Sequence, residues 1–312
     1  MGQSVLDMLL KGMFRFLLLC NIALLGVWKT AAASELIAEG EEKNVLLMKN
    51  GAVVLAHTGQ YERKFPVNAM LDGDLRYYWA SSPQGPKGKR PQSFVIELQQ
   101  RYKLYKLAVD NREMDEEQFP GISAREVRFS VSVESAKSGW KPVATLEASQ
   151  FSRKEEVLVE PVEARWLKVE VLSNYGFRLT EINELEAYGK PAGQAAPFVD
   201  PNGVYQTNYG LLKLEVDGDK VTGCYEMDKG YVHGATNGRV FDVEWIEHKG
   251  KERGKALLVL SSSGFLNGLW YDDKGVLEGP WFGTKLRQNS IECEPLSAAM
   301  GVGFRADTLV NQ

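Results

Sequence analysis

An acidic cluster, Asp72-Gly73-Asp74, is the sequence feature best suited to holding a metal ion. Ca2+ takes roughly six to eight oxygen ligands, several of them from backbone carbonyls in a tight loop. A glycine between two aspartates permits such a loop. A solvated Asp-Gly turn that is capped by its own side chains would give the same pattern. The residues alone therefore leave two interpretations, a calcium loop at Asp72 and Asp74 or an ordinary turn.

Aromatic and planar polar side chains between the predicted strands could bind a sugar. A sugar ring needs an aromatic face for its apolar side and hydrogen-bonding groups for its hydroxyls. Each candidate could equally be an ordinary solvated or half-buried side chain. The candidate ligand-binding residues are Tyr61, Arg63, Asn111, Arg112, Tyr175 and Phe177.

No catalytic motif occurs in the sequence. The three histidines, at positions 57, 233 and 248, are dispersed, and there is no His-Glu-x-x-His. Ser261-Ser262-Ser263-Gly264 is not a Gly-x-Ser-x-Gly elbow, and no glycine-rich phosphate loop opens a helix. We therefore expect a protein that is not an enzyme, although 41 acidic residues leave room for a carboxylate pair that meets only in space.

The elements that must position these residues begin after an N-terminal leader. Arg15 precedes the apolar run of residues 16–27, and Ala31-Ala32-Ala33 follows it. A basic residue, a short apolar stretch and small residues describe a secretory signal peptide. We predict a signal peptide at residues 1–33, cleaved after Ala33 or alternatively after Ala32. An uncleaved anchor is the competing interpretation, but the run is shorter than the ~20 residues of a membrane span. The mature chain is therefore expected to be exported, periplasmic or extracellular, without a transmembrane span.

The first half of the mature chain alternates apolar and polar residues over short segments. Such alternation predicts strands with one wet face, stacked as a sandwich. The clearest segments are residues 94–98, 127–133, 157–159, 166–172 and 183–188.

A composition change divides this region from the next. Residues 191–199 are rich in Pro, Ala and Gly and form the predicted linker. Short strands with frequent Gly turns follow in residues 200–287, which favours a small antiparallel meander closed into a barrel. Residues 288–312 are a polar, aperiodic tail. Four aromatics of the barrel could line a ligand cavity or fill its core: Trp270, Tyr271, Trp281 and Phe282.

Cysteine usage fits an exported chain. Cys20 lies in the leader, so Cys224 and Cys293 remain in the mature chain. In an oxidising compartment these two could form a disulfide. Cys224 alternatively suits a small buried apolar position.

Charge excludes one class of partner. The chain carries 37 Lys and Arg against 41 Asp and Glu, a formal net charge of −4, and no long basic block. Nucleic acid is therefore not expected as a partner.

Several segments in order resemble the discoidin family, also called the coagulation factor 5/8 type C or galactose-binding-like domain. They cover residues 45–190. The segments are Asn68–Asp74, Tyr77–Ser82, Phe94–Leu98, Ser138–Val143, Arg165–Val169, Ser173–Gly176 and Glu184–Gly189. The Arg-Trp, Ser-Asn-Tyr-Gly and Glu-Leu-Glu pieces also look like the bacterial branch found beside secreted NAD glycohydrolases. The region after the linker is only loosely similar to avidin-like or lipocalin-like barrels.

This resemblance implies a jelly-roll sandwich that binds glycans or lipid head groups through the loops at one end. It also implies that a structural Ca2+ at the Asp72 loop takes a glutamate from the last strand, Glu184 or Glu186. The predicted fold is therefore all-β, an N-terminal jelly-roll β-sandwich at residues 45–190 followed by a small antiparallel meander or β-barrel at residues 200–287.

The predicted function is that of an exported, non-enzymatic protein that binds carbohydrate or another cell-envelope ligand. Two alternatives stay open. One is a secreted enzyme with a catalytic C-terminal barrel and a discoidin-like targeting module. The other is a structural envelope protein.

Overall fold

The computed structural model describes residues 43–83, 91–113, 116–151, 153–195, 197–287 and 291–293. The predicted leader and most of the predicted tail lie outside the described residues. The described residues from Asn44 onward belong to one compact unit. None of the helices in these ranges is long and apolar enough to cross a membrane.

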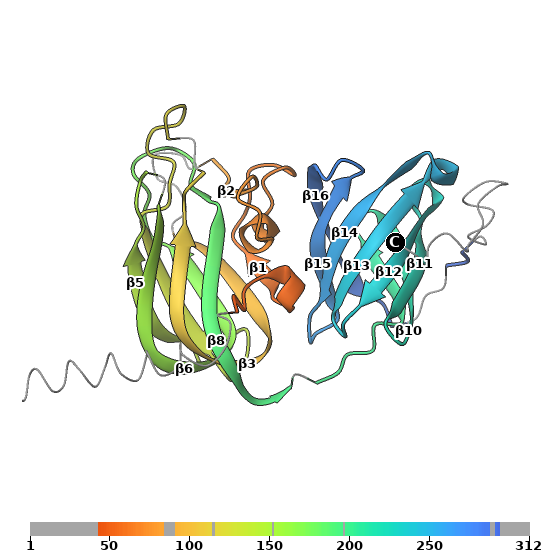
Figure 1. Cartoon of the computed structure of the whole chain (residues 1–312), viewed down its shortest axis with the longest axis horizontal. Coiled ribbons are helices and arrows are strands. Elements are labelled where there is room, and N and C mark those ends of the chain that lie inside the picture. Colours follow the sequence, from red (N-terminus) through yellow and green to blue (C-terminus); the bar gives the residue numbers. More distant parts are fainter. Residues whose placement is uncertain are drawn as a thin grey trace, which may run out of the picture. The chain divides into compact units, whose positions relative to one another are not determined.

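The described residues form strands and short 3-10 helices only (Figure 1). The elements of the first half are η1 Met48–Asn50, β1 Val53–His57, η2 Val67–Leu71, β2 Trp79–Ala80, β3 Gln92–Asp110, β4 Glu126–Ser132, β5 Lys141–Glu147, β6 Lys154–Val171, β7 Glu181–Ile182 and β8 Glu184–Ala195. The elements of the second half are β9 Gly203–Thr207, β10 Gly210–Asp217, β11 Lys220–Tyr225, η3 Met227–Lys229, β12 Gly230–Thr236, β13 Val240–Glu247, η4 His248–Gly250, β14 Glu252–Leu260, β15 Phe265–Asp272 and β16 Leu277–Lys285.

Two long strands organise the first half into a sandwich. The main sheet has the order β1-β3-β6-β4-β5, and β8 pairs with β3 as well. The first part of β3 pairs with β1 and its second part with β8, with register shifts between them. Because β3 exchanges β1 for β8 along its length while β6 pairs with both of its parts, the sheet wraps around a core that both parts share. Trp79 lies in that core, where its ring meets Phe94 edge-on at 4.7 Å between centroids.

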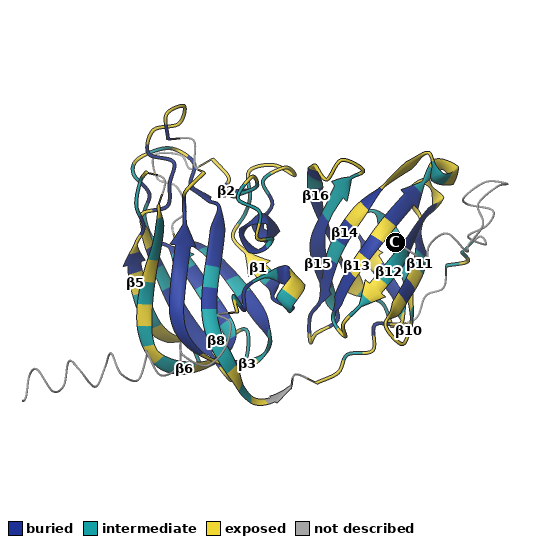
Figure 2. Ribbon diagram, in the orientation of Figure 1, coloured by how far each residue is buried: buried dark blue, intermediate teal, exposed yellow. Residues whose placement is uncertain are grey.

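The second half is a closed antiparallel barrel. Its eight strands follow one another as an up-and-down meander, and β16 pairs with β9 to close it. Figure 2 shows the alternation of buried and exposed residues along these strands. β13 illustrates it, because Phe241, Val243 and Trp245 are buried whereas Asp242 and Glu244 are exposed. The predicted all-β fold class, a sandwich followed by a small barrel, is confirmed.

The strand that leaves the sandwich runs further than the alternation indicates. β8 continues to Ala195 and therefore takes in residues that we assigned to the linker. Pro191 is Tyr102's partner on β3, and Ala195 is Gln100's. Proline is tolerated there because β8 has only one neighbouring strand, so the missing N–H leaves no bond unmade.

Outward-facing barrel residues join the core of the sandwich. Val240, Val259, Leu269 and Leu277 belong to the same buried cluster as the sandwich interior. The apolar–polar alternation did not indicate this packing, because an apolar residue on the outer face of a strand only interrupts the alternating pattern.

A buried charge cluster accompanies this packing. The Glu97 carboxylate of β3 accepts hydrogen bonds from Arg165 at 2.9 Å and from Arg239 at 2.6 Å. The hydroxyl of Ser262 donates a third bond at 2.7 Å. Burial alone would raise the pKa of Glu97, but the two guanidinium groups and Ser262 together hold it below its usual range. The carboxylate is therefore ionised and paired.

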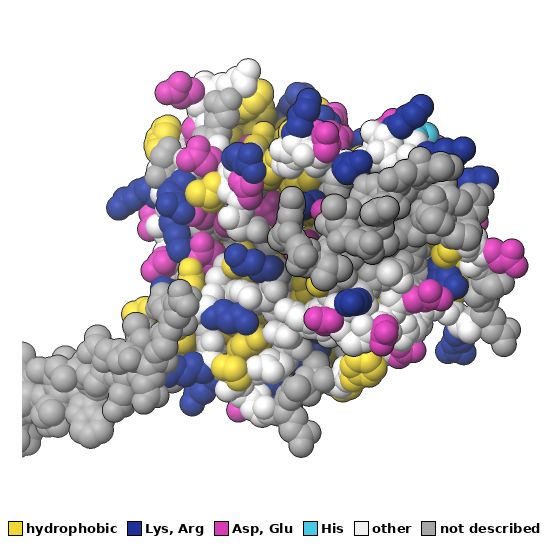
Figure 3. Space-filling view, turned by 45° about the vertical axis from the view of Figure 1, so that its right-hand side comes forward, with side chains coloured by type: hydrophobic (Ala, Val, Ile, Leu, Met, Phe, Trp, Pro, Cys, Tyr) yellow, Lys and Arg dark blue, Asp and Glu magenta, His cyan; other side chains and the backbone are white. Residues whose placement is uncertain are grey.

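The surface is mixed in charge. Figure 3 shows Lys and Arg side chains interspersed with Asp and Glu on the face that it presents. No described helix or strand is a basic stripe of the kind that tracks a polyanion.

Candidate functional site

Loops from four parts of the sequence meet at one end of the sandwich. Ser123 bridges to Glu181, and Ala124 bridges to Asn174. The loop after β1 joins them through β2, since the Tyr61 N–H donates to the Ala80 carbonyl at 2.8 Å and Ala80 pairs with Glu181. Loops are where a rigid β scaffold commonly places its binding residues. The convergence that the resemblance implied is therefore present in the backbone.

A buried glutamate, Glu116, fixes the shape of the longest of these loops. Its carboxylate accepts hydrogen bonds from the N–H groups of Gly121 and Ser123, the second at 2.8 Å. Gln150 donates a further bond at 3.2 Å. Burial alone would raise the pKa of Glu116, but these hydrogen bonds together lower it. Sequence reasoning missed this residue, because it lies in an acidic run that looks like a solvated loop.

Two phenylalanines form an apolar pair at this end. The rings of Phe119 and Phe177 lie 5.8 Å apart, and Phe119 is 38% exposed. A tight contact beneath them holds the two loops together. Gly121 has a φ of +89°, and a Cβ there would lie 2.8 Å from the Tyr175 carbonyl oxygen. Only glycine fits this approach without strain, which keeps the two rings in contact.

Tyr175 and Arg125 come from the same two loop segments as the phenylalanines. Arg125 follows Phe119 between β3 and β4, and Tyr175 precedes Phe177 between β6 and β7. Tyr175 donates from its hydroxyl to the Ala148 carbonyl at 2.7 Å. The Arg125 guanidinium lies over the Tyr175 ring at 5.4 Å from its centroid, and the same group pairs with Glu147. The arrangement offers a ring, a planar donor and a carboxylate at the surface, which are the groups that recognise sugar hydroxyls.

The other predicted ligand residues differ in their exposure and in their hydrogen-bond and ion-pair partners. Tyr61 is 41% exposed and packs its ring 5.9 Å from Phe65. Arg112 is half exposed and forms a two-pronged ion pair with the buried Asp110. Asn111 is fully buried, and its amide donates to the carbonyls of Ala124 and Ser149. Asn111 is therefore a residue that ties loops together and is not available to a ligand, which corrects the prediction.

Arg63 lies apart from the other candidates. Its guanidinium is 5.7 Å from the ring centroid of Trp270 in the barrel and 3.8 Å from the Glu278 carboxylate. Arg63 therefore belongs to the surroundings of the barrel. The sequence placed it with Tyr61 only because the two are neighbours in the chain.

Two of the three predicted metal ligands form a carboxyl pair. Glu184 is 3% exposed, and its Oε1 accepts a hydrogen bond from the Gly73 N–H at 3.0 Å. Asp72 Oδ1 accepts a bond from the Asp74 N–H at 2.7 Å. Burial, with the Asp72 charge beside it, raises the pKa of Glu184, and burial also raises the pKa of Asp72. Two acidic groups are thus held together out of water.

Asp74 is turned away from this pair. Its carboxylate makes a two-pronged contact with the Arg76 guanidinium, with an Nη2–Oδ2 distance of 2.5 Å. The arginine holds the pKa of Asp74 below its usual range. The predicted set of three side-chain ligands is therefore reduced to two.

The remaining pair fits a hard divalent cation. The Glu184 Oε2 atom is buried and has no hydrogen-bond partner among the described residues. Carboxylate oxygens next to a tight turn are the donors that Ca2+ prefers, and its charge would offset the cost of burying two carboxylates. Asp72 and Glu184 would hold the ion and thereby fix the Asp72 loop to the start of β8.

Residues 55–185 match the family model of the F5/8 type C domain. This part of the chain is a discoidin-like F5/8 type C domain. No curated protein matches the chain at a significant level. The match leaves the barrel outside the family.

Solved structures similar to this chain include three sugar-related proteins. CBM32-3 from a family 31 glycoside hydrolase of Clostridium perfringens is 19% identical, with 51% of this chain and 98% of that chain covered and a TM-score of 0.40. The C-terminal domain of a chitobiase from Bacteroides fragilis is 18% identical, with coverage of 49% and 100% and a TM-score of 0.41. The family 32 module of C. perfringens NanJ, in complex with galactose, is 17% identical, with coverage of 47% and 99% and a TM-score of 0.39.

A disulfide ties the segment after the last barrel strand back to β11. Cys224 on β11 is bonded to Cys293, which lies 69 residues further along the chain. The Cys224 side chain is also buried. Cys224 therefore both forms the disulfide and occupies a small buried position, the two alternatives that the sequence left open.

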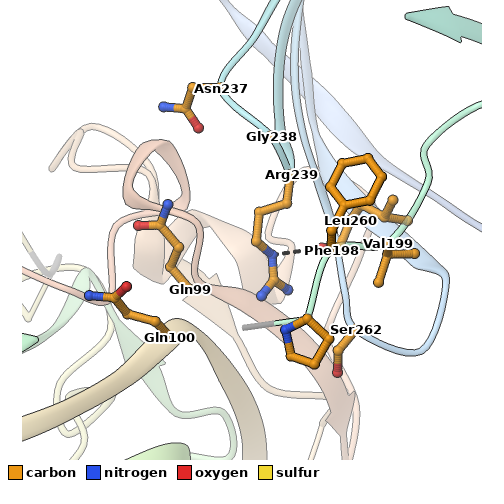
Figure 4. A pocket seen from close by; sticks show the side chains of 10 residues that line it. Gln99, Gln100, Phe198, Val199, Asn237, Gly238, Arg239, Leu260 and Ser262 are labelled. Carbon is orange, nitrogen blue, oxygen red and sulfur yellow. Dashed lines mark hydrogen bonds between the residues drawn. The ribbon is translucent and has the colours of Figure 1, made fainter. Parts of the chain in front are cut away.

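A small cavity borders the F5/8 type C domain, beside residues 197–199 (Figure 4). Its volume is about 180 Å³. Arg239, its charged residue, donates from Nε to the Leu260 carbonyl at 2.7 Å and from Nη2 to Glu97. The arginine is thus occupied by the protein itself, and we place no ligand in this cavity.

Proposed function

We propose that the protein is an exported, non-enzymatic binding protein whose F5/8 type C domain binds carbohydrate of a cell envelope. The observation that carries the proposal is the ring pair of the exposed Phe119 and the half-buried Phe177, which lies among loops that a buried scaffold holds in place. An apolar ring pair in water is costly to leave uncovered, and the apolar face of a sugar ring can cover it.

The polar groups beside the rings support the same ligand. Arg125 and Glu147 are both at least half exposed and can exchange hydrogen bonds with hydroxyls. The Tyr175 ring is held in place by its bond to Ala148, so little side-chain entropy is lost when a ligand binds. A preorganised site of this kind suits a neutral glycan.

Two features support export. The leader at residues 1–33 has the pattern of a signal peptide. The Cys224–Cys293 disulfide is the kind of bond that persists in an oxidising compartment. The protein recovered outside the cytoplasm should therefore begin at Ser34, or at Ala33 if the alternative cleavage site is used. Mass spectrometry of the exported protein tests this, and a mass that includes the leader would contradict it.

A glycan array probed with the full mature chain tests the binding proposal. We expect binding to a defined set of glycans and about a tenfold loss of affinity for Phe177→Ala, since a ring contact contributes about 0.5–1.5 kcal/mol beyond its area. Leu158→Ala is the matched control, because Leu158 is a 57% exposed apolar residue on β6, away from the loops. Binding that is absent, or equally reduced by Leu158→Ala, would contradict the proposal.

A further inference from the structure

One end of the barrel gathers four of its hairpins. In an up-and-down meander, alternate turns lie at the same end. The turns between β9 and β10, β11 and β12, β13 and β14, and β15 and β16 therefore share one rim. Residues from β9 to β16 that are far apart in the sequence can therefore meet there.

Five aromatic residues meet below this rim. Trp270 is edge-on to Trp245 at 5.5 Å and to Tyr209 at 5.9 Å, and Tyr209 is 5.6 Å from Trp281. Trp281 in turn lies 5.0 Å from Tyr225. The rings form a continuous wall that four different hairpins supply. Hydrogen bonds lock two of the tryptophans, from Trp270 Nε1 to the Tyr209 hydroxyl at 2.8 Å and from Trp245 Nε1 to the Tyr271 carbonyl at 2.9 Å.

Two glycines let rings lie flat across the backbone. A Cβ on Gly230 would meet the Tyr225 ring at 2.0 Å, and a Cβ on Gly254 would meet the Trp245 ring at 2.6 Å. Side chains at these positions would push the rings into the barrel interior. Because these two positions are glycines, the Tyr225 and Trp245 rings lie close against the strands and leave space toward the barrel axis.

The result is an open cavity. The cavity has a volume of about 310 Å³, and all five aromatic residues line it. This size is at the lower end of the range for small-molecule sites. Elsewhere the barrel interior is filled, since Phe241, Leu258 and Leu266 are fully buried in its core. We call the open end the aromatic cup.

Carboxylates surround the cup. Its lining includes four acidic residues and one arginine: Glu247, Glu252, Asp272, Glu278 and Arg63. Glu247 is half buried and accepts a hydrogen bond from the Tyr225 hydroxyl at 2.6 Å. The acidic residues outnumber the arginine, so a ring-walled site here favours a positive charge.

The arginine already shows how a cation sits against these rings. Arg63 lies over the Trp270 ring while pairing with Glu278. Ring faces carry a negative quadrupole that attracts such a group, and the attraction grows when the cation is desolvated. Arg63 is more than half exposed and stays at the rim, so the inner rings remain available.

One buried donor in the cup has no acceptor. Trp281 is 3% exposed, and its Nε1 has no hydrogen-bond partner among the described residues. A buried N–H without a partner costs free energy, which a ligand oxygen would recover. This observation is independent of the acidic rim and points to a ligand with an acceptor.

We propose that the aromatic cup binds a small organic ammonium ion that also carries a hydrogen-bond acceptor. The rings solvate the cationic head, Glu247 and the other acidic residues balance its charge, and Trp281 donates to the acceptor. This site is separate from the glycan surface of the F5/8 type C domain.

Titration of the full mature chain with choline tests the proposal. Choline has a cationic head and a hydroxyl, and 3,3-dimethylbutan-1-ol is its neutral counterpart of the same shape. We expect choline to shift the tryptophan emission and to bind at least about tenfold more tightly than the alcohol, as about 1.4 kcal/mol of cation–ring attraction requires. Calorimetry gives the two affinities directly.

Variants tie the binding to the cup. Glu247→Gln and Trp270→Leu should each weaken choline binding about fivefold or more. Glu244→Gln is the matched control, because Glu244 lies on the same strand but faces solvent. Circular dichroism verifies that each variant is folded.

The outcomes separate the alternatives. Equal affinity for choline and the alcohol, or no binding of either probe, would each overturn the proposal. Loss of binding in Glu244→Gln as large as in Glu247→Gln would overturn it as well. The glycan array tests the other proposed site separately, because Phe177 is not among the residues that line the cup.

Discussion

The sandwich and the barrel use tryptophan in opposite ways. Trp79 of the sandwich is fully buried, with its ring against Phe94 and its Nε1 bonded to the Gly59 carbonyl. Trp270 of the barrel is half buried and faces a cavity. The Trp79 ring fills the core of the sandwich, whereas the Trp270 ring lines the aromatic cup. An aromatic residue therefore becomes a candidate for ligand binding where the protein's own side chains leave part of its ring uncovered.

Truncating the two tryptophans gives the largest expected contrast. Trp79→Ala should lower the free energy of unfolding by about 3–5 kcal/mol, because it empties a filled core. Trp270→Ala should lower it by only about 1–2 kcal/mol, since the ring already borders open space. Urea unfolding followed by circular dichroism measures both. Equal losses would mean that Trp270 is an ordinary core residue and does not line a binding cavity.

The next largest expected change in the free energy of unfolding comes from the buried charge cluster that joins sandwich and barrel. Glu97→Gln should cost about 3 kcal/mol at pH 7, because it leaves Arg165 and Arg239 buried without their anion. The pKa of Glu97 is lowered in the folded state, so its contribution is complete above the ordinary value of 4.5. It is lost as the pH falls through the lower, folded-state pKa.

Unfolding of the wild type and of Glu97→Gln at several pH values checks this sign. The difference between the two proteins should be largest at pH 6–7 and should shrink at the lowest pH at which both still fold. Arg101→Gln is a suitable control, since Arg101 makes an exposed ion pair with Glu163. A difference that grows as the pH falls would contradict the assignment of Glu97 as the ionised partner.

Calcium should distinguish the two halves, because both of its proposed side-chain ligands, Asp72 and Glu184, belong to the sandwich. Addition of Ca2+ at a hundred times its dissociation constant should stabilise the chain by about 2.7 kcal/mol. Glu184→Gln should abolish this effect, since it removes a buried carboxylate from the pair with Asp72. Thermal unfolding with Ca2+ and with a chelator measures it, and Asp74→Asn is the control, because the Asp74 carboxylate faces Arg76. An equal Ca2+ effect in wild type and Glu184→Gln would place the ion elsewhere.

Alternation made the fold class predictable, because a strand with one wet face repeats every two residues. It could not show that β3 bends at its register shifts and exchanges β1 for β8 as its neighbour. A bend of this kind depends on which strands arrive later in the chain. It also could not show that Val240 and Leu269 cover the sandwich, since outward apolar residues gain meaning only once a partner surface exists.

The candidate site was predictable only in part, because the sequence locates loops but does not show which way their side chains point. Segment order located the loops of Tyr175 and Phe177, but Asn111 and Arg63 were assigned by their place between strands. Whether such a residue points to solvent, into a loop or at another domain depends on contacts distant in sequence. Phe119 and Glu116 were missed because an acidic stretch hid them, although an isolated apolar residue in such a stretch is a usable signal.

The most direct test of the account is one affinity measured on three proteins. The strongest glycan from the array is titrated into the wild type, Phe177→Ala and Glu247→Gln. The account predicts about a tenfold weaker affinity for Phe177→Ala and an unchanged affinity for Glu247→Gln, because the glycan surface lies on the loops of the sandwich. Unchanged binding by Phe177→Ala together with a loss in Glu247→Gln would contradict it and would move glycan recognition to the barrel.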